Sequence, residues 1–259
     1  MAEDQVSHIR IERTDHRLEI YLGHEPENRL IPDMMNHMAD ELEAVKGDDN
    51  LKLIVFRSSL DRIFSLGMDL EQLTSEHVGG FMASFGHLLY TLNEQSAITV
   101  ACVDGACMGS ALELAVYCDM AIASSRSNLG HPGIKAGIFP PVAAAVYPHL
   151  VGRNRAIEIL VTGRELSAEE AREMGLLNRV WPAGEFYDHS EAFFRSIERY
   201  SAVALRLTKK AIEQAIYKRV PVALRAAEDI YLNELMKTHD ANEGVRAMLE
   251  GRDPEWRND

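Results

Sequence analysis

Cysteine is scarce in this chain, and long apolar or basic runs are absent. The three cysteines, Cys102, Cys107 and Cys118, form no C-x-x-C pair, so neither a disulfide framework nor a structural zinc site is expected. No apolar run approaches the roughly 20 residues of a membrane span, so no membrane partner is expected. A net charge of −13, without any Lys/Arg run longer than two, argues against nucleic-acid binding. With an acidic, polar start, MAEDQVSHIR, these absences predict a protein of the reducing cytoplasm.

Strand and helix patterns alternate up to about residue 182. Two short alternating runs, HIRIER and RLEIYL, predict an N-terminal hairpin. Apolar strand patterns separated by helical stretches then follow, which is the order of repeated βαβ units around a largely parallel sheet. After Pro148 the pattern turns helical, and from about residue 185 only helices are expected. We therefore expect an α/β core over 1–182 and a helical C-terminal region over 183–259 that packs on the core or on a neighbouring subunit.

Two turns that follow strands could carry chemistry. In FSLGMD, Gly67 permits a tight turn, and the N–H of Met68 would point out of the end of the sheet. In DGACMGSALELAVYCD, a helix opens near Gly109 and Ser110, where the first N–H groups have no intrahelical acceptor. Glu113 lies one turn further among apolar neighbours, where a carboxylate is costly unless it is partnered or functional. Two N–H donors and one carboxylate can polarise a thioester carbonyl and move protons beside it.

The chain resembles the crotonase (enoyl-CoA hydratase/isomerase) superfamily from its first hairpin to its last helix. Four segments carry the resemblance: FSLGMDL, DGACMGSALELAVYCDMAIAS, LVTGRELSAEEAREMGLLNRV and EGVRAMLEGRDPEW. The resemblance implies an α/β fold built as a spiral of ββα turns with a C-terminal helical trimerisation region. It also implies a homotrimer or a dimer of trimers that binds an acyl-CoA thioester, with coenzyme A as part of the substrate. No metal or redox cofactor is expected.

Carried over by motif, the resemblance assigns roles to particular residues. It places the two N–H donors of the oxyanion hole on Met68 and Ser110, and the first catalytic glutamate on Glu113. Further contacts to the acyl-CoA are expected from Leu66, Gly109, Gly133 and Phe139. For the phosphates of coenzyme A, the candidates are Arg62 and two basic pairs in the tail, Lys209-Lys210 and Lys218-Arg219.

The second catalytic glutamate of the hydratases is missing. In the family it belongs to a Pro-Glu dipeptide, which in this chain is Pro132-Gly133. In an extended segment His131 would point to the same side as Gly133, so His131 is a candidate acid/base in its place. A structural, hydrogen-bonded His131 is the competing interpretation. His87 is a weaker candidate, and Asp119 is expected to be structural.

Three kinds of function stay open at this point. The first is hydration of an enoyl-CoA or, because GIFPPVAAA is most similar to such enzymes, of a cyclic dienoyl-CoA. The second is another crotonase-type reaction, either isomerisation or thioester hydrolysis, for which Cys107 and His131 could form a nucleophilic pair. The third is acyl-CoA binding without catalysis, which the missing glutamate suggests.

Overall fold

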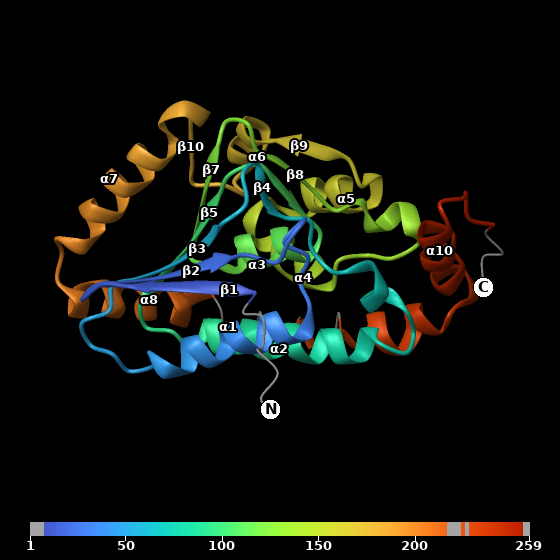
Figure 1. Ribbon diagram of the computed structural model, residues 1–259, viewed down its shortest axis with the longest axis horizontal. Coiled ribbons are helices and arrows are strands. Elements are labelled where there is room, and N and C mark those ends of the chain that lie inside the picture. Colours follow the sequence, from blue (N-terminus) through green and yellow to red (C-terminus); the bar gives the residue numbers. More distant parts are fainter. Residues whose placement is uncertain (1–7, 217–223, 226–227, 256–259) are drawn as a thin grey trace.

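A six-stranded sheet forms the frame of the molecule. The computed structural model describes residues 8–216, 224–225 and 228–255. The strand order is β1-β2-β3-β5-β7-β10, with β1 antiparallel to β2 and the later pairs parallel. Their bounds are Ile9–Arg13, Arg17–Leu22, Leu53–Ser58, Ile98–Val103, Met120–Ser124 and Arg179–Trp181. The predicted hairpin and the largely parallel sheet are confirmed (Figure 1).

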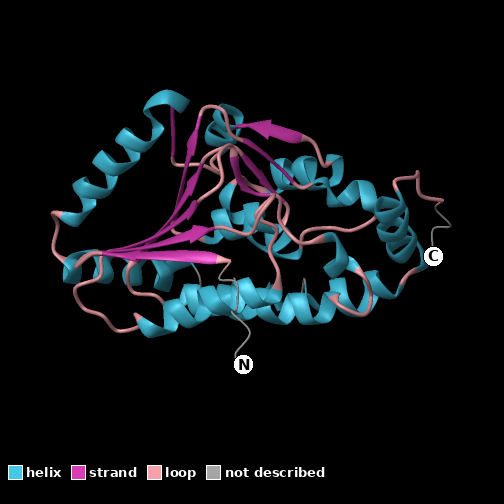
Figure 2. Ribbon diagram, in the orientation of Figure 1, coloured by secondary structure: helices cyan, strands magenta, loops and turns pink. Residues whose placement is uncertain are grey.

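A second sheet contains four short strands in the order β4-β6-β8-β9. The first three are parallel, and β9 is antiparallel to β8. Their bounds are Ile63–Ser65, Ala106–Met108, Asn128–Gly130 and Glu165–Ser167. Each of β4, β6 and β8 follows a strand of the large sheet and precedes helical structure. This is the ββα repeat that the resemblance implies. In Figure 2 both sets of strands lie among the surrounding helices.

The core helices begin and end where the sequence places its signals. The bounds are Pro32–Ala44 for α1, Val78–Asn93 for α2, Ser110–Tyr117 for α3 and Ala168–Met174 for α6, with short 3-10 helices at Leu70–Leu73 (η1), Pro132–Ala136 (η2) and Ala183–Glu185 (η3). Helix α6 is capped at its start, because the Ser167 side chain accepts the N–H of Glu170 at 3.2 Å. Helices α1 and α2 pack against each other (Figure 1).

The segment around Pro148 differs from the expectation. Helical structure begins earlier, with α4 at Pro141–Leu150, and continues with α5 at Arg153–Thr162. Pro141 is the first residue of α4, a position where proline is favoured because its missing N–H would have no intrahelical acceptor. Pro148 lies inside α4, near its end. The adjacent prolines Pro140 and Pro141 therefore mark the start of α4.

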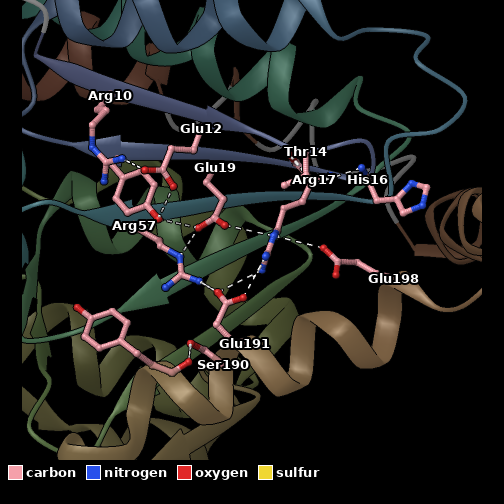
Figure 3. A network of polar contacts seen from close by, with 12 residues as sticks. Arg10, Glu12, Thr14, His16, Arg17, Glu19, Arg57, Ser190, Glu191 and Glu198 are labelled. Atoms are coloured by element: carbon pink, nitrogen blue, oxygen red, sulfur yellow. Dashed lines mark hydrogen bonds and ion pairs between the residues drawn. The ribbon is translucent and has the colours of Figure 1, made fainter.

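Helix α7, Phe186–Glu198, covers one face of the large sheet. Phe186 and Phe194 pack there against buried strand residues such as Val55. Charged groups add to this contact. Two residues of α7, Glu191 and Glu198, form ion pairs with arginines of β2 and β3 (Figure 3).

The remaining C-terminal elements are also helical, as expected. They are α8 at Ala202–Ile216, the short helices η5 and η6 at Ile230–Glu234 and Leu235–Lys237, and α10 at His239–Glu250. Helix α8 leaves three large apolar side chains at least half exposed, namely Val203, Leu207 and Ile212. Among the described residues, no helix is both long and apolar enough to cross a membrane.

Candidate active site

The small sheet brings the predicted turns together. Strands β4, β6 and β8 are parallel, so their carboxyl ends reach the same edge of the sheet. The chain leaves β4 toward Met68, β6 toward Ser110, and β8 toward His131. The turns touch closely, because a Cβ on Gly67 would lie 2.5 Å from the carbonyl oxygen of Met108. Glycine at position 67 is therefore a requirement of this contact as well as of its φ of 80°.

The backbone leaves the N–H groups of Met68 and Ser110 available. Met68 forms an isolated parallel bridge with Leu30. The two hydrogen bonds of this bridge join Leu30 to the neighbours of Met68: Leu30 N–H donates to the carbonyl oxygen of Gly67, and Asp69 N–H donates to the carbonyl oxygen of Leu30. In a parallel bridge the N–H of the central residue points to the other side. Ser110 is the first residue of α3, so its N–H has no intrahelical acceptor. The unusual backbone angles fall on Gly109, with φ 53°, so the side chain of Ser110 fits without strain.

Glu113 is buried one turn into α3. Its Oε1 accepts a hydrogen bond from the N–H of Ala143 at 2.9 Å, in the first turn of α4. Burial raises the pKa of Glu113 to about 7, and hydrogen bonds from the backbone of Ala143 and Val142 oppose part of that rise. The proline-initiated helix thus holds the carboxyl group that the sequence singled out. The group changes its charge near neutral pH.

His131 lies beside the same turns, fully enclosed by protein. Its Nε2 is 2.6 Å from the hydroxyl oxygen of Tyr147, and the two rings pack edge to face. Burial lowers the pKa of His131 to about 3. The imidazole of His131 is therefore neutral at neutral pH and has no cationic proton to release, while its role as an acid/base stays a prediction.

These residues surround a cavity of about 450 Å³. Glu113, His131, Met68 and Ser110 all line it. So do the residues expected to contact the acyl-CoA, namely Leu66, Gly109, Gly133 and Phe139. Its other walls are mainly apolar and include residues of η1, α2 and the C-terminal region, such as Leu73, Phe81, Phe85, Tyr231 and Met248. The cavity combines an apolar lining with a few polar groups, which is typical of a small-molecule site.

Several residues around the cavity were missed by the sequence analysis. Tyr147 lies sixteen positions after His131, and no local pattern connects the two. Tyr231 comes from the C-terminal region and packs its ring against Phe139, with ring centres 5.5 Å apart. The contact of Glu113 with α4 had a usable signal. The pair Pro140-Pro141 is typical of a helix start, whose free N–H groups favour a carboxylate.

The residues predicted to contact the phosphates of coenzyme A differ in their exposure. Lys209 is buried, and its Nζ lies 2.7 Å from Asp119 Oδ2 and 3.1 Å from the carbonyl oxygen of Ala97. Lys209 therefore ties α8 to the sheet, and Asp119 has the structural role expected of it. Lys210 and Arg62 are exposed, while Lys218 and Arg219 lie outside the described residues. Two cations that the sequence analysis did not select, Arg29 and Lys135, line the cavity.

The cysteine alternative finds little support in the geometry. Cys107 is fully buried, and burial together with the nearby Cys118 raises the pKa of its thiol. A thiol of that kind stays protonated and is a poor nucleophile. The Nε2 atom of His131 forms its hydrogen bond with the hydroxyl group of Tyr147 and not with the thiol of Cys107. His87 is exposed and lines a separate groove with Glu228.

Across residues 8–216, 224–225 and 228–255, no group of three or more His, Cys, Asp or Glu side chains is placed to hold a metal ion.

The chain belongs to the enoyl-CoA hydratase/isomerase family, whose model matches residues 18–259. It is 28% identical over 252 residues to a probable enoyl-CoA hydratase of Mycobacterium tuberculosis (strain CDC 1551 / Oshkosh), covering 96% of this chain and 97% of that protein. A probable mitochondrial enoyl-CoA hydratase of Arabidopsis thaliana is 28% identical over 231 residues, 88% of this chain and 76% of the relative.

A solved structure agrees with the fold. The crystal structure of an enoyl-CoA hydratase from Mycobacterium avium subsp. paratuberculosis K-10 matches with a TM-score of 0.87. The match covers 98% of this chain and 100% of that chain at 24% identity. The crotonase-type ββα fold implied by the sequence resemblance is thereby confirmed.

Proposed function

We propose that this chain is an acyl-CoA enzyme that reversibly adds water to the alkene of an enoyl-CoA or cyclic dienoyl-CoA thioester. The observation that carries the proposal is Glu113, a buried carboxyl group with a pKa raised to about 7, on the wall of a cavity shared with Met68 and Ser110. A group that titrates near neutral pH can both accept and release a proton within one cycle. The relatives named as enoyl-CoA hydratases support the same reaction.

The proposed mechanism uses three groups of this chain. The N–H groups of Met68 and Ser110 donate hydrogen bonds to the thioester oxygen and stabilise the charge that develops on it. The Glu113 carboxylate removes a proton from water while the water oxygen bonds to the β-carbon, and an enolate forms. The same carboxyl group then returns this proton to the α-carbon, which restores the thioester. One carboxyl group thus completes the addition of H and OH, and the reaction as proposed needs no metal or redox cofactor.

The proposal also includes how the chain binds coenzyme A and how it assembles into an oligomer. The cationic side chains of Arg29 and Lys135 on the cavity wall would contact the phosphates of coenzyme A. The half-exposed apolar side chains of α8 support a contact with further copies of the chain, as a homotrimer or a dimer of trimers. In this arrangement, residues 1–182 form the binding core, and the helical region 183–259 packs on that core, where it completes the cavity wall, and contacts neighbouring subunits.

A panel of thioesters tests the proposed reaction. Purified protein is incubated with crotonyl-CoA, a longer linear 2-enoyl-CoA and a cyclic dienoyl-CoA. The loss of enoyl-thioester absorbance and the gain of one water in the product mass are then measured. Hydration of at least one member is expected. Binding of all members without any change in mass would contradict the proposal and favour the non-catalytic alternative.

Isomerisation is the second candidate, and the single carboxyl group favours it. One carboxyl group can also take a proton from one carbon of an enoyl-CoA and return it to another. Incubation with a 3-enoyl-CoA separates the two reactions, because only isomerisation brings its alkene into conjugation with the thioester and so raises the enoyl-thioester absorbance, whereas a hydratase without isomerase activity leaves this substrate unchanged. Release of free coenzyme A thiol would instead indicate thioester hydrolysis.

A further inference from the structure

Two buried side-chain atoms of residues that line the cavity have no hydrogen-bond partner among the described residues. They are Oγ of Ser110 and Nδ1 of His131. The two residues are 5% and 1% exposed, and both line the cavity that contains Glu113. Burying a polar atom without a partner is unfavourable, so such atoms in a binding cavity indicate contacts made to a ligand.

The backbone places both residues next to the proposed oxyanion hole. The N–H of Gly109 donates to the carbonyl oxygen of Gly130 at 2.9 Å, and Ser110 and His131 each follow one of these glycines. The N–H of Ser110 is one of the two proposed donors to the thioester oxygen. Both residues therefore leave the backbone beside the proposed oxyanion hole, where the reacting carbons would lie, and not at the distal end of the acyl group.

Tyr147 determines which nitrogen of His131 carries the proton. The phenol is fully buried, and burial raises its pKa well above the ordinary value, so its hydroxyl group retains its hydrogen. Within the described residues, the partner recorded for that hydroxyl is Nε2 of His131, at 2.6 Å. If Tyr147 donates to Nε2, the neutral imidazole carries its own hydrogen on Nδ1. The opposite arrangement would leave the buried hydroxyl hydrogen without an acceptor.

We propose that His131 Nδ1–H, together with the hydroxyl group of Ser110, binds the oxygen atom that hydration adds to the β-carbon. That oxygen belongs to water before the addition and to the β-hydroxyl group after it. Glu113 accepts a hydrogen bond from the group that carries this oxygen, and His131 donates a hydrogen bond to the oxygen. The oxygen is thus held by one acceptor and one donor. In the reverse direction, the donor stabilises the departing oxygen.

The proposal explains how the site works without a carboxylate at position 133. A second carboxylate would accept hydrogen bonds from water and would repel the charge of Glu113. The neutral donor of His131 avoids that repulsion. Space also limits position 133, where a Cβ would lie 3.1 Å from Cγ1 of Ile138. This inference rests on the proposed hydration, because it assigns an oxygen that only hydration supplies.

A binding experiment separates this inference from the reaction itself. In a Glu113→Gln background, which prevents turnover, the affinities for butyryl-CoA and for each enantiomer of 3-hydroxybutyryl-CoA are measured by calorimetry. One enantiomer should bind about 5-fold to 10-fold more tightly than butyryl-CoA, the contribution of one or two hydrogen bonds. Adding His131→Phe should reduce this preference to below about 2-fold.

Further variants test the assigned atoms, with one control. His131→Asn keeps a donor at the position of Nδ1, so it should retain most of the preference, whereas Ser110→Ala should remove a smaller part of it. His149→Phe, at an exposed histidine of α4, is the matched control and should leave the preference unchanged. If His131→Phe does not fold, Tyr147→Phe serves instead. It leaves the imidazole hydrogen free to occupy either nitrogen and should weaken the preference.

The outcomes for the two proposals are distinct. A hydroxyl preference that is absent, or that is the same with and without His131→Phe, would overturn this inference even if the wild-type protein hydrates enoyl-CoA. A preference that depends on His131, in a protein that hydrates none of the thioesters, would support the oxygen site and overturn the proposed reaction.

Discussion

Two regions of this molecule bury charged groups, and they treat the charge in opposite ways. Between β2, β3 and α7, the carboxylates of Glu19, Glu191 and Glu198 face the guanidinium groups of Arg17 and Arg57 (Figure 3). The Nε atom of Arg57 lies 2.6 Å from Glu19, and the Nε atom of Arg17 lies 3.3 Å from Glu198. We call these five residues the sheet–helix network.

Glu113 in the cavity is held differently. It accepts a hydrogen bond from a backbone N–H group, and no ion pair to it occurs among the described residues. Burial therefore raises its pKa to about 7. The comparison indicates that charge matched by opposite charge holds elements together, whereas a buried group without a countercharge remains able to exchange its proton near neutral pH.

The largest effect is expected from Glu113→Gln. The amide keeps the shape of the side chain but cannot take a proton from water, so turnover should fall by about three orders of magnitude while acyl-CoA binding is retained. Steady-state kinetics and calorimetry measure the two quantities. Glu173→Gln, at an exposed position of α6, is the control. Near-normal turnover in Glu113→Gln would remove Glu113 from the mechanism.

In the sheet–helix network, substitution should affect stability and not catalysis. Glu19→Gln leaves the buried arginines of β2 and β3 short of one countercharge, and we expect a loss of about 3 kcal/mol in the free energy of unfolding. Urea denaturation measures this loss, with the exposed Glu12→Gln as the control. A stable variant with reduced turnover would mean that the two regions are not separate in function.

The pH dependence of stability distinguishes the regions in another way. The pKa of Glu113 is raised from 4.5 to about 7 in the folded protein, so folding favours its protonated form. This contribution is complete below pH 4.5 and is lost as the pH rises through about 7, for a total of about 3 kcal/mol. The wild type should therefore lose stability relative to Glu113→Gln over this range. Parallel stability curves for the two proteins would show that the carboxyl group is not desolvated.

The smallest effect is expected at Cys107. The fully buried thiol is proposed to have a packing role, so Cys107→Ala should change turnover by less than about 3-fold and reduce stability slightly. Treatment of the folded wild type with iodoacetamide should leave its activity intact. Inactivation that acyl-CoA prevents, together with an inactive Cys107→Ala variant, would restore the thiol alternative.

Sequence reasoning located the site through features that are local in the chain. Three of these features lie beside a strand end or within one helical turn of it, namely Gly67, Gly109 and Glu113. Short sequence motifs are therefore enough to predict them. The large sheet was predictable for a similar reason, since its central strands β2, β3, β5 and β7 are five or six residues long. The strands of the small sheet have three residues each, which is too short for any apolar period to appear.

The features that sequence reasoning missed depend on contacts between distant segments. Tyr147 reaches His131 only because the fold brings α4 beside the residue that follows β8, and Tyr231 reaches the cavity from the C-terminal region. The pKa of His131 depends on complete burial, which no motif encodes. For Lys209, the sequence suggested a contact to the phosphates of coenzyme A, whereas the fold buries it against Asp119.

The pH dependence of kcat/KM for hydration tests the central claim most directly. If the free carboxylate of Glu113 is the base, kcat/KM should rise about tenfold per pH unit at low pH and level off above about 7. His131, with its pKa lowered to about 3, should add no further step near neutral pH. A profile that levels off near the ordinary glutamate value of 4.5, or one that is flat from about pH 5 to 8, would contradict the account.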